Sequence, residues 1–340
     1  MTSLATRRSS MGEVPMTATL DRTSNDRVGA KGYVLDFGRI GLRDHGRVGG
    51  KNASLGELLR AMKPRGVSVL DGFATTASAY RRLLRERGLG RRLEAIFAPF
   101  DLADLKELAD RGEAARGAVL ETPLPTELSA AILAAYDRLC RRVGRNPEIA
   151  VRSSVTAPDL PEASFAGSSE TFLNVRGREG LLRAVLGCLS SLFTDRAISY
   201  RARLGCDHLA VALSVGVQPM VRSDKASAGV MVTLDTGSGS RDVVTVSGSW
   251  GLGELVVQGV VTPDEWTVFK PTLATGHRAI LGRHLGSKEV RLVYGDGSKG
   301  TRSEQVPAAD RARYCLADDE VLLLSRWACM IEDHYSSVTG

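Results

Sequence analysis

The sequence predicts a mixed α/β (or α+β) fold with two lobes. Segments whose apolar residues have helical spacing are interspersed with short, alternating or β-branched segments that are typical of strands. Glycine-rich turns separate many of these segments, and 340 residues leave room for roughly two domains. We therefore expect an N-terminal lobe at 31–205 and a second lobe at 206–335. A disordered leader at 1–30 and a divergent tail at 336–340 would flank them.

The leader is expected because Ser, Thr, Arg and Asp follow one another there without periodic order. A strand is expected at 33–37, and a loop at 45–50 then leads into a helix. One face of that helix carries four apolar residues, Leu55, Leu58, Leu59 and Met62. This places Lys51 beside a helix N-terminus, where backbone N–H groups and an ammonium favour an anion.

The glycines before Lys51 do not form a P-loop, which would need Gly in place of His45 and Ser or Thr in place of Asn52. Without further context, a capped surface helix is the better explanation of Gly-Gly-Lys. Residues 72–76 end a strand and cap the next helix, whose apolar face includes Tyr80 and Leu83. Amphipathic helices are expected at 101–117, 125–143 and 179–204, as scaffold.

Residues 150–175 read AVRSSVTAPDLPEASFAGSSETFLNV, a strand, a loop rich in hydroxyls and small residues, and a second strand. Backbone N–H groups of such a loop can cover phosphates, and Arg152 adds a fork of donors suited to phosphate oxygens. The alternative is a proline-broken surface hairpin whose arginine is merely solvated.

A later strand at 209–221 alternates, with Val211, Leu213, Val215 and Val217 on one side. Gln218 lies on the other side, where its amide offers both donor and acceptor to an adenine edge, unless it simply faces solvent. Further strands are expected at 226–234, 242–246, 265–270 and 289–294, with a glycine-rich turn at 248–253. A last helix begins near 318, at three consecutive acids.

Composition excludes several classes of protein. No apolar run approaches the ~18 residues of a membrane span, and Arg7 and Arg8 precede no apolar signal core. The five cysteines have no paired spacing, which argues against a zinc site or disulfide framework and favours a reducing cytoplasm. The net charge is +6, and its densest arginine cluster, at 81–92, is better explained as a solvated helix face than as a nucleic-acid site.

Residues 150–175 closely resemble the nucleotide-binding domain of the phosphoenolpyruvate synthase (pyruvate, water dikinase) family. That group also includes pyruvate, phosphate dikinases and rifampicin phosphotransferases. Four more stretches agree in the expected order, and the resemblance runs over 33–335. They are VGGKNASLGE at 48–57, GFATT at 72–76, QPMV at 218–221 and GSWGLGELVVQGVVTPDEWTVFKPTL at 248–273.

The resemblance implies an ATP-grasp-type fold and roles for seven residues. Lys51 and Arg152 would contact phosphates, Gly167 and Thr171 would lie on the phosphate-covering loop, and Gln218 would lie at the base. Glu265 and Lys270 are weaker candidates for the wall of the site. None of the five histidines stands in a motif of a phosphoryl carrier.

The resemblance also implies ATP and Mg²⁺ as cofactors. After Tyr335, relatives continue into two strands that carry the acid and the Gln that hold the metal, whereas this chain reads SSVTG. The usual metal ligands are thus missing, as are phosphohistidine and pyruvate-binding domains. We expect a truncated ATP-binding module that does not run the full reaction alone. The alternatives are a rifampicin-phosphotransferase-like ATP domain and a non-catalytic nucleotide-binding remnant.

Overall fold

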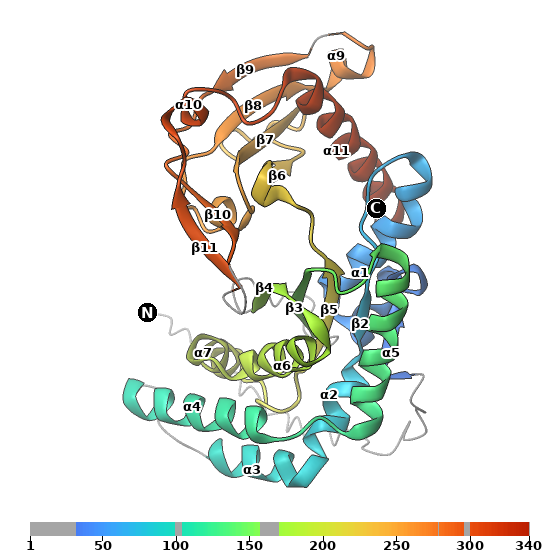
Figure 1. Cartoon of the computed structure of the whole chain (residues 1–340), viewed down its shortest axis with the longest axis vertical. Helices are drawn as coiled ribbons and strands as arrows, with labels where there is room; N and C mark the ends of the chain where they lie inside the picture. Colours follow the sequence, from blue (N-terminus) through green and yellow to red (C-terminus); the bar gives the residue numbers. More distant parts are fainter. Residues whose placement is uncertain (1–31, 99–103, 157–169, 278, 296–299, 340) are drawn as a thin grey trace, which may run out of the picture.

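The computed structural model describes residues 32–98, 104–156, 170–277, 279–295 and 300–339. They form two lobes, each built on an antiparallel sheet, at opposite ends of the molecule (Figure 1). The predicted two-lobed architecture is therefore confirmed. The expected leader at 1–30 and Gly167 lie outside the described residues.

The first lobe is built on a five-stranded sheet in the order β1-β2-β5-β3-β4. Its strands are β1 (Val34–Asp36), β2 (Phe73–Thr75), β3 (Ile149–Thr156), β4 (Thr171–Val175) and β5 (Ala212–Pro219). The sequence assigned β5 to the second lobe, yet it pairs with both β2 and β3. On strand pairing, the first lobe thus extends to Pro219, beyond the boundary expected at residue 205.

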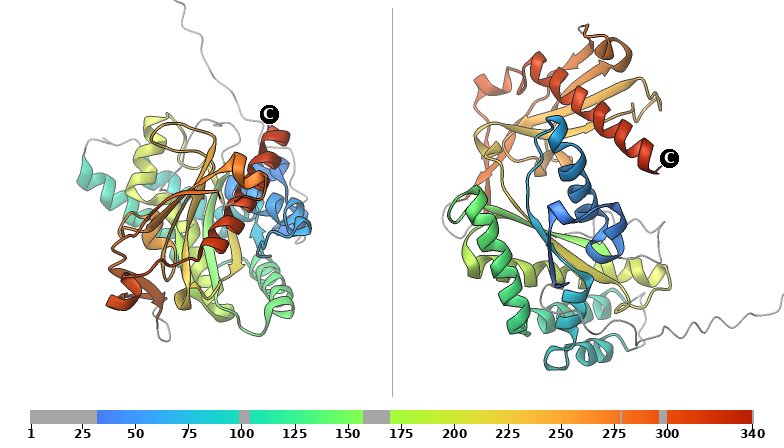
Figure 2. Two further views of the ribbon diagram at one scale, coloured as in Figure 1. Left: turned by 90° about the horizontal axis from the view of Figure 1, so that it is seen from above. Right: turned by 90° about the vertical axis from the view of Figure 1, so that its right-hand side faces the viewer.

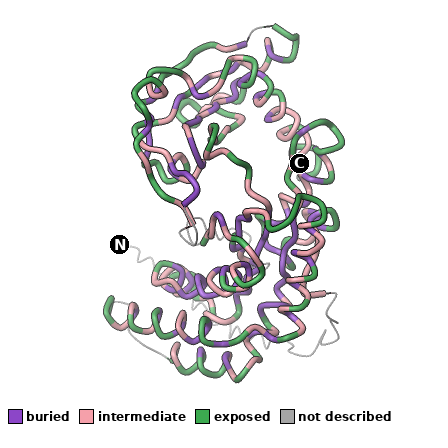
Figure 3. Tube along the Cα trace, in the orientation of Figure 1, coloured by how far each residue is buried: buried purple, intermediate pink, exposed green. Residues whose placement is uncertain are grey.

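Helices cover both faces of this sheet. They are α1 (His45–Ala61), α2 (Ala77–Leu84), α3 (Leu89–Ile96), α4 (Leu105–Glu121), α5 (Thr126–Val143), α6 (Gly177–Ser190) and α7 (Asp195–Arg203). The alternation in β5 turns Leu213, Val215 and Val217 toward the main core, where Tyr80 and Leu83 of α2 also lie. On the opposite face, α1 packs through a smaller cluster that includes Val48 and Ala53. Figure 3 shows this dense burial around the first sheet.

The second lobe contains a four-stranded sheet in the order β6-β7-β8-β9. Its elements are β6 (Ser227–Val232), β7 (Val243–Trp250), α8 (Glu254–Val257), β8 (Asp264–Phe269), α9 (Lys270–Ala274), β9 (Ile280–His284), the hairpin β10 (Val290–Tyr294) and β11 (Thr301–Gln305), α10 (Ala308–Arg311) and α11 (Asp318–Thr339). Trp266 and Val268 of β8 and Val321 of α11 belong to one buried cluster, which holds α11 against the sheet.

Among the described residues, two sets of hydrogen bonds join the lobes. In the first, the side-chain amide of Asn174 on β4 donates to the backbone oxygens of Gly295 (3.3 Å) and Gly300 (2.7 Å) in the β10–β11 hairpin. In the second, the C-terminal part of α11 forms hydrogen bonds with α1. Figure 2 shows α11, in red, from two further sides. These contacts hold the first sheet and the second lobe in a defined relation.

Three local expectations differ from the structure. The segment 179–204 is not one helix, because it breaks at a short 3-10 turn, Ser191–Phe193, between α6 and α7. The expected glycine turn at 248–253 begins later, because Gly248 still pairs with Gly229 and Asp264 inside the sheet. The hydroxyl of Thr76 donates to the Gly32 oxygen (2.9 Å) instead of capping α2.

Candidate functional site

Lys51 lies in the first turn of the regular part of α1. Helical geometry is interrupted at Gly49, where φ is 77° and ψ is 158°, so the continuous helix starts only after this residue. Only glycine adopts this region at little cost. Lys51 therefore lies beside a helix N-terminus, as predicted. The first N–H groups of an α-helix have no partner within the helix.

Two glycines let α1 approach the sheet closely. A Cβ on Gly49 would lie 2.2 Å from the Ser154 hydroxyl of β3, and a Cβ on Gly216 of β5 would lie 2.2 Å from Asn52 Oδ1. Asn52 itself donates to the Ser214 hydroxyl (2.9 Å) and to the Val48 oxygen (3.0 Å). A glycine inside a strand commonly marks such a close approach. The packing fixes the start of α1, and with it Lys51, against β3 and β5.

Arg152 projects from the same face of the sheet. In the strand register it lies opposite Thr171 of β4 and Gly216 of β5. Directly opposed residues of antiparallel strands share a face, so the side chains of Arg152 and Thr171 are neighbours on the side that α1 covers. The structure thus brings together Lys51, Arg152 and Thr171, three of the predicted site residues.

Electrostatics links Lys51 and Arg152 directly. Lys51 is solvent-exposed as a residue, yet partial desolvation and the charge of Arg152 lower the pKa of its ammonium. Arg152 is also exposed as a residue, and partial desolvation of its guanidinium lowers its pKa, which the carboxylate of Glu254 partly offsets. Two cations held close together on one face, with the carboxylate of Glu254 in the second lobe acting on Arg152, form a site that favours an anionic ligand.

Gln218 lies two residues along β5 from Gly216 and therefore on the same face. Its side chain is nearly buried, with 8% exposed, so the solvent-facing alternative is wrong. The amide nitrogen donates to the Leu70 oxygen (3.1 Å). One donor of the amide is thus used within the protein, which leaves the other groups of the amide for a ligand.

Glu265 and Lys270 belong to the second lobe, on β8 and at the start of α9. Glu265 is exposed on β8, and Trp266 and Val268 turn toward α11 from the other face of the strand. Lys270 Nζ donates to both carboxylate oxygens of Glu332 on α11 (2.9 and 2.7 Å) and to the Thr233 oxygen (2.6 Å). These contacts give Lys270 a structural role in holding α11, and its place in the wall of the site stays a prediction.

A family model described as the pyruvate phosphate dikinase AMP/ATP-binding domain matches residues 45–339. This chain belongs to that family. The match includes most of the residues expected to form a divergent tail, which α11 also includes up to Thr339. The matched range includes every described residue of the group around Lys51 and Arg152.

Among similar proteins, phosphoenolpyruvate synthase of Synechocystis sp. is 51% identical over 313 residues, which cover 90% of this chain and 38% of the relative. The Pseudomonas aeruginosa phosphoenolpyruvate synthase is 51% identical over 306 residues (89% and 39%). The Escherichia coli phosphoenolpyruvate synthase is 48% identical over 310 residues (90% and 39%). The chain spans about two-fifths of the length of these relatives.

In this AMP/ATP-binding domain, sequence reasoning missed Glu254 and Asn52. Glu254 directly follows a turn at Gly251, whose φ is 86°, and starts α8 of the second lobe. An acid after a glycine turn would have indicated a partner of Arg152 only if the position of Arg152 in the fold had been known. Asn52 follows Lys51 in sequence, but its contact with Ser214 spans 162 positions and leaves no local pattern.

The described residues contain no group of three or more His, Cys, Asp or Glu side chains that could hold a metal ion. All five cysteines are free thiols. Within the described ranges, each helix is too short or too polar to cross a lipid bilayer.

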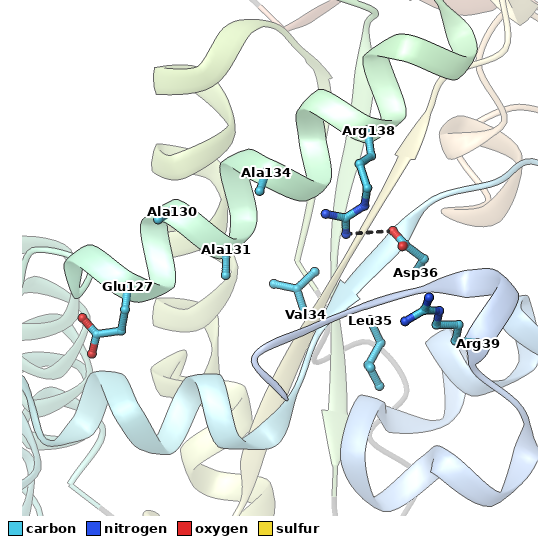
Figure 4. A pocket seen from close by; sticks show the side chains of 9 residues that line it. All are labelled: Val34, Leu35, Asp36, Arg39, Glu127, Ala130, Ala131, Ala134 and Arg138. Carbon is cyan, nitrogen blue, oxygen red and sulfur yellow. Dashed lines mark hydrogen bonds and ion pairs between the residues drawn. The ribbon is translucent and has the colours of Figure 1, made fainter. Parts of the chain in front are cut away.

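The first lobe also has a hollow of about 760 Å³ between β1 and α5 (Figure 4). Its floor is apolar, with Val34 and three alanines of α5, and Arg39, Arg138 and Asp36 lie at one end. Arg138 donates to Asp36 (3.2 Å). None of the predicted site residues lines this hollow, so it is separate from the group around Arg152.

Proposed function

We propose that this chain binds ATP between its two lobes, with the phosphates on Lys51 and Arg152. The observation that carries this proposal is the pair of adjacent cations at the start of a helix, each with a lowered pKa. Their repulsion and desolvation disfavour the charged forms in the free protein. A polyphosphate would neutralise both groups and accept bonds from the N–H groups that begin α1.

Each residue would then have a distinct part in positioning the nucleotide. Lys51, fixed by the packing of Asn52 and Gly49, would hold the phosphates as a point charge. Arg152 would offer its planar fork of donors, oriented by the carboxylate of Glu254. Since phosphoryl transfer depends mainly on positioning and charge neutralisation, these cations would supply the protein's share of both.

The remaining predicted residues complete the proposed site. Thr171, beside Arg152, and Gly167, outside the described residues, would belong to the loop that covers the phosphates. Gln218 would contact the base with the part of its amide that Leu70 does not use. Glu265 and Lys270 remain candidates for the wall of the site. Mg²⁺ would arrive with the nucleotide and be held through its phosphate oxygens, as is usual for this ion.

We further propose that the chain is the nucleotide-binding module of a phosphoenolpyruvate synthase. That reaction converts ATP, pyruvate and water to AMP, phosphoenolpyruvate and phosphate through a phosphohistidine. The names of the similar proteins favour it over rifampicin phosphorylation. Phosphohistidine and pyruvate-binding domains would be needed as partners, because the relatives are much longer than this chain. A cytoplasmic location fits the five free thiols.

Thermal unfolding with and without magnesium-ATP tests nucleotide binding. A ligand at 100 times its dissociation constant adds about 2.7 kcal/mol to the free energy of unfolding. We expect a saturable upward shift of the melting temperature in the parent chain. The shift should be much smaller in Lys51→Ala and in Arg152→Ala, and unchanged in Lys63→Ala, which removes an exposed lysine beyond α1.

Unchanged ATP affinity in Lys51→Ala and Arg152→Ala would contradict the assigned phosphate site. A cooperatively folded parent chain that shows no shift at millimolar ATP would contradict nucleotide binding altogether. Lys270→Ala separates two roles in the same assay. A loss of stability with unchanged ATP affinity would remove Lys270 from the site.

A further inference from the structure

Arg201 occupies a core position of α7. Its neighbours one turn back, Ala197 and Ile198, are buried, and Arg201 shares their face by helical spacing. The whole residue has 0% of its surface exposed. Arginine is rarely buried to this extent unless its charge is paired.

Within the described residues, the terminal nitrogens of this buried guanidinium have no hydrogen-bond partner. Nε donates to His208 Nδ1 (3.4 Å), and the guanidinium carbon lies 5.8 Å from the centre of the Phe193 ring. Both Nη1 and Nη2 are buried and make no hydrogen bond with any residue that the structure describes. Buried N–H groups nearly always have a partner, so a further acceptor is missing here.

A second orphaned group lies near Arg201. The hydroxyl of Tyr80, on α2, is buried and also finds no hydrogen-bond partner in the part of the chain that the structure describes, and the residue is only 1% exposed. The charge of Arg201 lowers the pKa of the Tyr80 hydroxyl, while burial raises it more strongly. The hydroxyl therefore remains protonated at neutral pH and is a donor, like the two nitrogens.

The charge of Arg201 is not balanced by a bonded carboxylate in the described residues. Burial lowers the pKa of Arg201 to about 10, so the guanidinium is still charged at neutral pH. Asp207 acts on it electrostatically, but this residue is exposed and its carboxylate accepts from the Leu209 amide (2.9 Å). Burial, with the charge of Arg201, lowers the pKa of His208, which makes the ring a neutral neighbour.

We propose that Arg201, through Nη1 and Nη2, and Tyr80, through its hydroxyl, bind a small inorganic anion of the halide class inside the first lobe. A water molecule would accept hydrogen bonds but would leave the charge uncompensated, and an unpaired buried charge is strongly unfavourable. The complete burial of both residues restricts the ligand to a monatomic size. The anion would tie α7 to α2, whose Tyr80 lies in the main core on the face of the sheet opposite α1.

The proposal is tested with chloride as the probe. Thermal unfolding of the full chain is compared in sodium chloride and sodium gluconate at equal ionic strength, because gluconate is too large for the site. We expect a saturable rise of the melting temperature in chloride. It should be absent in Arg201→Met and retained in Arg203→Met, which removes an exposed arginine from the same helix.

Tyr80→Phe keeps the aromatic ring and removes only the hydroxyl. The half-saturating chloride concentration should rise about tenfold, as expected for the loss of one hydrogen bond to a charged ligand. If Arg201→Met does not fold, a crystal of the parent chain grown in bromide decides the question. An anomalous peak within hydrogen-bonding distance of the two Nη atoms supports the site. Water or a carboxylate of the chain in that place, or equal melting temperatures in the two salts, overturns it.

Discussion

His334 on α11 lies with its Nε2 atom 2.9 Å from Glu57 Oε1 on α1, and each side chain is 16% exposed. The next residue, Tyr335, donates its hydroxyl to the Ser54 oxygen (3.4 Å). Ser54 is three residues after Lys51, so the second lobe contacts α1 about one turn from the proposed phosphate-binding lysine. A movement of the second lobe relative to the first would therefore also shift α1, and with it Lys51.

His334→Ala should weaken the contact between α11 and α1 and lower the affinity for ATP by about threefold to tenfold, the effect of losing an interaction of about 1 kcal/mol. Titration calorimetry would give the affinities, and hydrogen exchange would follow the amides around Ser54. His277→Ala, a change at an exposed histidine of the second lobe, is the matched control. Equal ATP affinity in His334→Ala and the parent chain would show that the contact does not act on the site.

Gly49→Ala should destabilise the protein and displace the start of α1. The substitution combines a positive φ with a Cβ 2.2 Å from the Ser154 hydroxyl and 2.7 Å from the Val155 oxygen. We expect a loss of about 1–3 kcal/mol in the free energy of unfolding, measured with urea. The neighbour Gly50 is the control, because a Cβ there has nothing within 4 Å.

Gly50→Ala should leave the free energy of unfolding unchanged or raise it by up to about 1 kcal/mol. If ATP phosphates lie over the start of α1, the same substitution should weaken ATP binding. Equal destabilisation by the two alanines would refute the packing argument for Gly49.

The lowered pKa of Lys51 predicts how ATP binding depends on pH. The phosphates would raise this pKa toward or above its usual 10.5, so binding takes up a proton when the lysine starts neutral. Affinity should therefore be constant near neutrality and fall as pH rises through the lowered pKa of the free protein. Lys51→Arg should bind with little dependence on pH up to pH ~10, because an arginine there stays charged. An alkaline fall of the same size in both proteins would assign the titration to another group.

Without ligand, the same lowered pKa makes the free energy of unfolding rise with pH, whereas it makes the affinity for ATP fall. Between the lowered pKa of folded Lys51 and the usual value, the unfolded chain binds more protons than the folded one. The contribution of Lys51 to the free energy of unfolding should thus rise with pH in that window. Comparing urea unfolding of the parent chain and Lys51→Met across this window isolates the contribution.

Asp264 and Lys288 form an ion pair in which both side chains are 0% exposed. Asp264 Oδ1 also accepts from the Gly286 amide (2.9 Å), and Oδ2 accepts from the Cys315 amide (2.8 Å). Asp264→Asn should cost about 3–5 kcal/mol in the free energy of unfolding, because it leaves a buried ammonium without its counter-charge. The adjacent exposed Glu265→Gln should cost less than about 0.5 kcal/mol. A loss below about 1 kcal/mol for Asp264→Asn would mean that Lys288 finds another partner.

Local sequence patterns predicted most of the elements and part of the site. The alternation around Val215 predicted β5, and the apolar spacing at 125–143 predicted α5, because both patterns arise from the faces of single elements. Two glycines before Lys51 indicated the start of a helix for the same reason. The next strand after Arg152, β4, was also predictable, because β4 pairs with β3, its neighbour along the chain.

By itself, the sequence determined the two-lobed fold class, the helix start at Lys51 and the strand that carries Arg152. Only the tertiary structure decided that β5 lies at the centre of the first sheet, that Glu254 acts on Arg152 and that Lys270 is bound to Glu332. It also decided that Arg201 is buried with no acceptor for Nη1 and Nη2 among the described residues. The physical reason is the distance along the chain over which residues interact. A periodic pattern records which face of an element is buried, but pairings between residues far apart in the chain depend on how complete elements pack, and no local pattern encodes their partners.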